Sequence, residues 1–219
     1  MNEKELVQLN NKKREQLTKE NRKYYEEMLV YIRLTYSKAY LETEEILSEL
    51  IDHLLEAQQE GKTAEDVFGN NPKQYADDII GELPNMVTKE RLKMFFMAIF
   101  YFFAVSTIFS GIIEIFMSGS LVKGYYIGSE AIRTLVSIPV ALLIVYVSLQ
   151  YLRWACFKNI NKIKEFFILW LWGTLSVGIF VVIFLLLPDV GPFMDIHIFV
   201  VFGIGIILFL AGHFMRKSM

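Results

Sequence analysis

Four ionisable side chains stand beside long apolar segments of this 219-residue chain, and they are the first candidates for chemistry. Glu114 lies about one helical turn before the end of one such segment, and Arg133 directly precedes the next. Asp195 and His197 come just before the last segment begins. One interpretation is an ion pair between Glu114 and Arg133 with solvated acids nearby. The other is a polar pocket that senses or passes an ion, a peptide or a drug.

A second set of polar residues lies in the first half of the chain, at Asp52, His53, Glu56, Glu65 and Asp66. A histidine and a glutamate three positions apart share one helical face, so His53 and Glu56 could act together. A metal site would need a second pair of ligands, which the sequence does not supply. We therefore expect structural roles, or a surface that recognises a partner, and we expect no cofactor and no metal.

Signatures of enzymes are missing from the sequence. It contains no His-Glu-x-x-His, no Gly-x-Ser-x-Gly and no glycine-rich phosphate loop. The single cysteine, Cys156, excludes an internal disulfide and a cysteine metal cluster. Basic residues are interrupted by acids instead of forming a phosphate-binding cluster, so direct nucleic-acid binding is not expected. These patterns favour a protein without enzymatic activity.

The segment 166–187 determines the protein class, because it contains 22 residues without a charged side chain. As a helix it would be about 33 Å long, close to the hydrocarbon thickness of a bilayer. Similar apolar segments lie near 94–117, 134–152 and 196–214. The sequence thus predicts a four-helix transmembrane domain over residues 94–219. A charge at the bilayer centre costs about 2.5 to 3.5 kcal/mol and less near an interface, so Glu114 is tolerated at a span end.

Basic residues near the ends of these segments are distributed unevenly. One side would carry nine of them, and the other only Lys123 and Arg133. The nine are Lys89, Arg91, Lys93, Arg153, Lys158, Lys162, Lys164, Arg216 and Lys217. The positive-inside rule then predicts that both termini are cytoplasmic and that Glu114, Arg133, Asp195 and His197 face outward.

The first 93 residues have the composition of a soluble helical domain, with 14 basic and 19 acidic residues against 8 and 5 in the remainder. A helix is predicted from Glu3 to about Tyr36, with a polar first part, residues 1–17, that frays. A second helix is predicted to begin at Thr43 and to end at Gly61. Shorter helices follow, one capped by Thr63 and one by Asn71. The sequence therefore predicts a cytosolic helical bundle over 18–84 and a linker with the start of a juxtamembrane helix over 85–93.

The segment Glu49–Gly69, ELIDHLLEAQQEGKTAEDVFG, together with Asn71–Asp77, NPKQYAD, resembles the HAAS-type helical domain. That domain precedes several membrane spans in largely uncharacterised proteins of Gram-positive bacteria. The resemblance covers residues 18–84, and EGKTAEDVFG is its most distinctive part. It implies a signalling or regulatory module, in some members linked to PadR-like transcription regulators, and it supplies no catalytic residues.

These observations together predict an all-α, non-enzymatic protein of the cell membrane that acts in regulation, signalling or protein interaction. Its bundle would bind a cytosolic or membrane protein, with a homo-oligomer as one form of that partnership. The alternative is transport, as an accessory subunit or a small self-assembling permease that uses the pocket around Glu114 and Arg133. The lipid bilayer is the one partner that both interpretations share.

Overall fold

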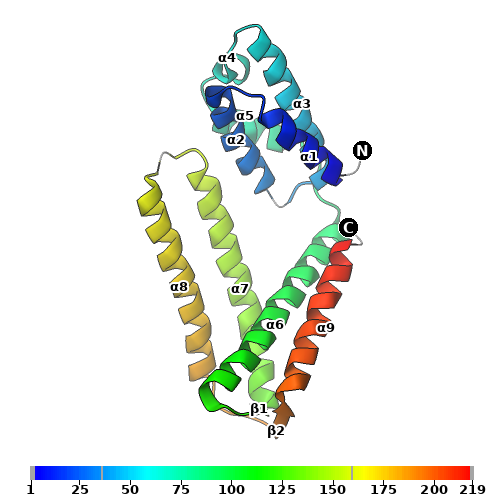
Figure 1. The fold of residues 1–219 in the computed structure, drawn as a ribbon, viewed down its shortest axis with the longest axis vertical. Helices are drawn as coiled ribbons and strands as arrows, with labels where there is room; N and C mark the ends of the chain where they lie inside the picture. The colour runs from blue at the N-terminus through cyan, green and yellow to red at the C-terminus, as the bar shows by residue number, and fades with distance from the viewer. Residues whose placement is uncertain (1–2, 36, 159, 218–219) are drawn as a thin grey trace. The chain divides into compact units, whose positions relative to one another are not determined.

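The computed structural model describes residues 3–35, 37–158 and 160–217. The elements follow the chain in the order α1 Glu3–Arg14, α2 Lys19–Arg33, α3 Tyr40–Gln59, α4 Ala64–Phe68, α5 Pro72–Glu82, α6 Thr88–Ser118, β1 Val122–Tyr126, α7 Ile127–Ala155, α8 Lys162–Leu186, β2 Phe193–His197 and α9 Ile198–Lys217 (Figure 1). They group into two compact units, Met1–Val87 with Tyr146–Asn161 and Thr88–Val145 with Lys162–Met219. The predicted all-α class is confirmed, and the short β1–β2 pair is an addition to it.

The first predicted helix is two helices. The continuous helix expected from Glu3 onward is wrong, because α1 ends at Arg14 and Thr18 caps α2 by accepting a hydrogen bond from the Asn21 backbone N–H. Helix α1 packs on α3, where Asn10 is buried and donates to the Glu44 backbone carbonyl at 3.1 Å. The segment in which fraying was expected is thus packed over residues 6–14. Tyr36 lies outside the described residues.

The core of the bundle lies between α2 and α3. Its largest fully buried apolar side chains are Tyr25, Met28 and Ile32 on α2, with Leu47, Ile51 and Leu54 on α3. Each such side chain contributes about 1.5 to 3 kcal/mol by leaving water. Their spacing of three and four residues puts them on one face of each helix, which is why these two helices pair. Cys156 and Phe157, which follow α7, also pack against this core.

Helix α3 begins earlier than the sequence predicts. It starts at Tyr40, so Thr43 is not its N-cap, and that prediction is wrong. The Thr43 hydroxyl instead donates to the carbonyl of Ala39 at 2.6 Å, inside the first turn. The backbone N–H of Ala39 binds the carbonyl of Pro84 at 3.0 Å, which fixes the chain just before the helix. A long-range backbone contact therefore sets the start of α3.

The predicted N-caps of the two short helices are confirmed. Thr63 and Asp66 form a capping box at α4, and Gly69 ends that helix with a φ of 84°. Asn71 caps α5 and Pro72 occupies its first turn. These local signals need few residues, so the sequence alone reveals them.

Four described helices, α6 to α9, are long and apolar enough to cross a membrane, and they contain most of each predicted span. The chain is therefore a multi-pass membrane protein. Helices α6 and α9 lie side by side (Figure 1). Glycine makes this approach possible, since a Cβ on Gly205 would lie 2.6 Å from Cγ1 of Ile108, and one on Gly111 2.8 Å from the Phe202 ring.

The connections 119–126 and 187–197 meet in a two-stranded antiparallel sheet, here called the ribbon. Its register pairs Val122 with His197 and Tyr126 with Phe193. Strand β1 continues directly into α7, and β2 directly into α9. The ribbon therefore joins the start of α7 to the start of α9.

Candidate functional site

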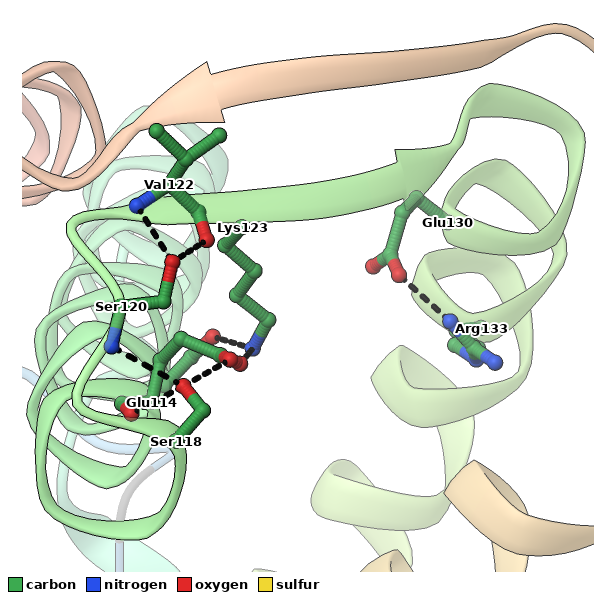
Figure 2. A network of polar contacts seen from close by, with 8 residues as sticks. Glu114, Ser118, Ser120, Val122, Lys123, Glu130 and Arg133 are labelled. Carbon is green, nitrogen blue, oxygen red and sulfur yellow. Dashed lines mark hydrogen bonds and ion pairs between the residues drawn. The ribbon is translucent and has the colours of Figure 1, made fainter.

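Lys123 is the centre of a polar cluster at the ribbon, formed with Ser110, Glu114, Ser118 and Tyr125 and called the Lys123 cluster below. Its ammonium group donates to the Ser110 hydroxyl at 2.6 Å and lies 4.0 Å from a carboxylate oxygen of Glu114 (Figure 2). The Lys123 side chain is only 16% exposed. Alternation along β1 puts Lys123 and Tyr125 on the face of the ribbon that looks toward α6.

Burial determines the electrostatics of this cluster. It lowers the pKa of Lys123 below its ordinary value, although the charges of Glu114 and Glu130 act in the opposite direction. Burial likewise raises the pKa of Tyr125, against a hydrogen bond with Ser110. The ammonium also lies 5.4 Å from the centre of the Tyr125 ring, within cation–π range. The lysine is thus held by specific partners in a partly desolvated place.

Glu114 is fixed by the turn that follows α6. The hydroxyl of Ser118 lies 2.6 Å from the Glu114 carboxylate and 2.7 Å from its backbone carbonyl, and can donate to either. The Ser118 oxygen accepts the backbone N–H of Ser120 at 3.3 Å, and Ser120 in turn accepts that of Val122 at 3.0 Å (Figure 2). This chain of bonds orients the carboxylate toward the strand that carries Lys123.

Arg133 forms a second polar group near the ribbon, called the Arg133 cluster. Its guanidinium lies 2.5 Å from a Glu130 carboxylate oxygen (Figure 2) and 3.6 Å from one of Asp189. It also lies 4.3 Å from the centre of the Phe184 ring. Two carboxylates and one aromatic face therefore surround a single cation that is 15% exposed.

Ser129 clamps the start of α7 to the segment that follows α8. It is fully buried, and its hydroxyl donates to the Pro188 carbonyl at 2.8 Å while accepting the Val190 backbone N–H at 2.7 Å. The backbones approach so closely that a Cβ on Gly128 would lie 2.6 Å from the Val190 carbonyl oxygen. This clamp sets the position of Arg133, one turn further along α7.

The four residues predicted at this end of the membrane helices do not form one pocket. Glu114 has Lys123 as its ion-pair partner, and Arg133 has Glu130 and Asp189, so the pair considered from sequence is replaced by two separate ones. Asp195 and His197 pair with Gly124 and Val122, on the ribbon face opposite Lys123. The His197 ring stacks on Phe199 with centres 5.2 Å apart. Sequence reasoning missed Lys123 as a site residue, although a lone lysine between two spans was a usable signal.

The residues predicted as a partner surface divide into two groups. The carboxylate of Asp52 forms an ion pair with Lys13 on α1 at 2.6 Å, and the carboxylate of Asp66 accepts a hydrogen bond within the α4 capping box. His53, Glu56 and Glu65 are exposed on α3 and α4. These three are the part of the predicted surface that is available to a partner.

A further contact joins the end of α7 to the bundle within the first unit, and the sequence did not predict it. The Tyr31 ring, only 5% exposed, lies 4.7 Å from the Arg153 guanidinium and 5.0 Å from the Phe157 ring. The Tyr31 hydroxyl donates to Asp77 at 2.6 Å, and Asp77 also binds Lys73 at 2.7 Å. This Tyr31 contact ties α2 and α5 to the end of a membrane helix.

No group of three or more histidine, cysteine and acidic residues in the described part of the chain could hold a metal ion. A hollow of about 400 Å³ lies between the start of α2 and the end of α3 and is lined by polar side chains such as Lys19, Gln58 and Lys62. The chemistry that the clusters offer is ion pairing and hydrogen bonding at a membrane boundary.

The chain matches the model of a known protein family. The model of the family described as "Protein of unknown function (DUF1129)" matches residues 16–219. The chain belongs to this family. No curated protein and no solved structure matches the chain.

The family match runs through helices α2 to α9 without interruption, so the DUF1129 family includes both the bundle and the membrane helices. The Lys123 cluster, the Arg133 cluster and the Tyr31 contact all fall inside the matched range. Both compact units of the structure therefore contribute residues to the one range that the family model matches.

Proposed function

We propose that this protein is a non-enzymatic membrane protein of regulation or signalling, whose cytosolic bundle binds a partner protein. The resemblance of Glu49–Asp77 to the HAAS-type domain of Gram-positive membrane proteins supports this proposal, because that domain is linked to transcription regulators in some members. The exposed residues His53, Glu56 and Glu65 are the surface we assign to the partner.

The observation that carries the proposal is the Tyr31 contact. Arg153 and Phe157 at the end of α7 cover a tyrosine that is hydrogen-bonded to α5. A displacement of α7 along its axis or about it would change this contact, and with it the packing of α2 on α5. This contact supports a bundle that responds to a membrane helix, as the regulatory proposal requires.

Orientation is part of the proposal: both termini are cytoplasmic and the ribbon faces outward, as the nine-to-two distribution of basic residues indicates. Single cysteines at Asp195 and Asn161, both exposed polar residues, test it in a Cys156→Ser background. Asp195 is preferable to its strand partner Gly124, where a Cβ would lie 2.5 Å from the Phe193 ring. Only Asp195→Cys should react with an impermeant maleimide added to intact cells, and the reverse pattern would contradict the orientation.

Partner binding is tested by a photo-crosslinking amino acid at position 53 of the full-length protein in native membranes. We expect one discrete adduct that disappears in Glu56→Lys/Glu65→Lys. The control is Asp78→Lys, an exposed acid on α5 outside the assigned surface, which should leave the adduct intact. The absence of a discrete adduct from positions 53, 56 and 65 would contradict the proposal.

A transport function is the second candidate, favoured by the Lys123 cluster, because buried charges at the ends of membrane helices often lie on solute pathways. It predicts a solute flux in proteoliposomes that changes in Glu114→Gln or Arg133→Ala. Flux equal to that of empty liposomes would reject it.

A further inference from the structure

The ribbon is attached to the membrane helices without any linker. Tyr126 of β1 is followed at once by the first residue of α7, and His197 of β2 by the first residue of α9. Hydrogen bonds continue across both junctions, from the Ile127 N–H to the Pro192 carbonyl at 3.0 Å and from the Ile198 N–H to that of Leu121 at 2.8 Å. Because these helices cross the bilayer, the ribbon cannot lie far from its surface.

Several apolar side chains on the ribbon and next to it are exposed. Leu121, Val122, Phe193 and Met194 are each between 42% and 53% exposed. They stand at both ends of the ribbon, beside exposed side chains of the membrane helices such as Ile127. The apolar surface of the helices therefore continues onto the ribbon.

Two aromatic residues of the ribbon, Tyr126 and Phe193, pack together at one of its ends. Phe193 packs on Tyr126 with ring centres 5.1 Å apart and also covers Gly124, where a Cβ would lie 2.5 Å from the ring. Tyrosine suits the boundary between hydrocarbon and water because its ring is apolar and its hydroxyl is polar, and the Phe193 ring adds apolar surface beside it.

The backbone of the ribbon rules out a position inside the hydrocarbon region itself. The sheet has two strands in the described part of the chain, so one edge of each strand lacks a strand partner. Such N–H and carbonyl groups need water or polar headgroups, because each costs several kcal/mol in hydrocarbon. Asp195 and His197, both exposed, have the same requirement. The headgroup region satisfies the apolar and the polar groups at once.

We propose that the β1–β2 ribbon is a lipid-contacting element that lies in the headgroup region of the bilayer, with the exposed side chains of Leu121, Val122, Phe193 and Met194, at both ends and on both faces of the ribbon, reaching the acyl chains. The continuity between its apolar residues and the membrane helices favours lipid over a second copy or another protein. Lys123 is paired with Glu114, so the ribbon offers no unpaired cluster of positive charge. Zwitterionic phospholipids therefore suffice for the contact.

Spin labels on the full-length protein in phosphatidylcholine nanodiscs test this inference. Single cysteines replace Val122 and Met194 in a Cys156→Ser background, because neither side chain covers Gly124. Val177→Cys in α8 is the matched lipid control, and Asn70→Cys on the bundle the aqueous control; both native residues are exposed. Collision rates of each label with oxygen and with a water-soluble nickel chelate are measured.

We expect the ratio of oxygen to nickel collisions at positions 122 and 194 to lie several-fold above that at position 70 and below that at position 177. A ratio equal to that at position 70 would overturn the inference, because the ribbon would then lie in water. Low collision rates with both reagents would also overturn it, because protein and not lipid would then cover the ribbon. Circular dichroism that matches the Cys156→Ser parent excludes misfolding as the cause.

Discussion

Lys123 shows how one side chain can connect two elements at the membrane boundary. Its ammonium donates to Ser110 on α6 from β1, at 2.6 Å and largely out of water. A hydrogen bond with one charged partner contributes about 1.5 to 3 kcal/mol. We expect Lys123→Met and Ser110→Ala each to lower the thermal stability of the protein in detergent.

The double variant distinguishes a direct interaction from two independent effects. If the two side chains stabilise the protein through their mutual bond, Lys123→Met/Ser110→Ala should cost clearly less than the sum of the single variants. Strict additivity would mean that Lys123 acts mainly through Glu114 or Tyr125. Thr174→Ala is a matched control, since this hydroxyl donates to the carbonyl of Trp170 within its own helix.

Asp66 gives the bundle a pH dependence with a definite sign. The backbone N–H and the hydroxyl of Thr63 both donate to its carboxylate at 2.8 Å, and these bonds lower its pKa below the ordinary value of 3.8. Its stabilising contribution is therefore complete above that value and is lost as the pH falls through the lower folded pKa. Hydrogen exchange of the α4 amides, corrected for intrinsic rates, should reveal this loss.

Two variants isolate the contribution of the capping box. Asp66→Asn should remove the pH dependence, and Thr63→Ala should speed α4 exchange by an amount equivalent to about 0.5 to 2 kcal/mol. Thr63→Ser keeps the hydroxyl and should preserve protection. An identical pH profile in Asp66→Asn would show that another carboxylate is responsible.

At the scale of elements, the packing of α6 on α9 depends on glycines that differ sharply in their surroundings. A Cβ on Gly205 would meet Ile108 at 2.6 Å and the backbone carbonyl of Ala104 at 3.3 Å, whereas nothing lies within 4 Å of a Cβ on Gly203. We expect Gly205→Ala to destabilise the membrane domain by about 1 to 3 kcal/mol through overpacking. Gly203→Ala is the matched control and should not.

Thermal unfolding in one detergent, followed by circular dichroism, measures both variants. The two glycines stand two positions apart in the same helix, so their effects on helix propensity are alike. Equal loss of stability in both would mean that propensity and not the α6–α9 contact is responsible.

The sequence predicts those elements whose signals are local. The capping box of Thr63, the proline after Asn71 and the apolar segments each lie within one element, and all of these predictions are confirmed. The ribbon was missed because Val122–Tyr126 has no partner in its own neighbourhood and pairs with residues about 70 positions away. The prediction that Thr43 is the N-cap of α3 was wrong for a similar reason, since the backbone hydrogen bond that fixes the start of α3 is accepted by the carbonyl of Pro84.

The same difference between local signals and long-range contacts explains which features of the candidate site could be predicted from the sequence. The sequence singles out Glu114 and Arg133 as charges near the ends of apolar segments, but their partners were not predictable. Lys123 reaches Glu114 only because the β1–β2 pair turns it toward α6, and Asp189 reaches Arg133 near the Ser129 clamp. The position of a charge along an apolar segment follows from sequence, whereas its pairing follows from tertiary structure.

At the scale of the whole molecule, the bundle is incomplete without the end of α7. Cys156 and Phe157 pack against its core, and Arg153 and Phe157 cover Tyr31. A chain of about 80 residues buries a modest core, so the loss of such contacts matters. We expect residues 1–87 alone to unfold at lower denaturant concentration than the same helices in the full-length protein.

Hydrogen exchange of the α2 and α5 amides compares the fragment with the full chain, and Phe157→Ala in the full chain reproduces the loss at a single position. Truncating a buried aromatic side chain costs about 3 to 5 kcal/mol in a core and less at a partly exposed site such as this one. Faster exchange of α2 and α5 in both proteins would follow if α7 supports the bundle. Equal protection in fragment and full chain would show that the bundle folds independently of α7, and would remove the physical link on which the regulatory proposal depends.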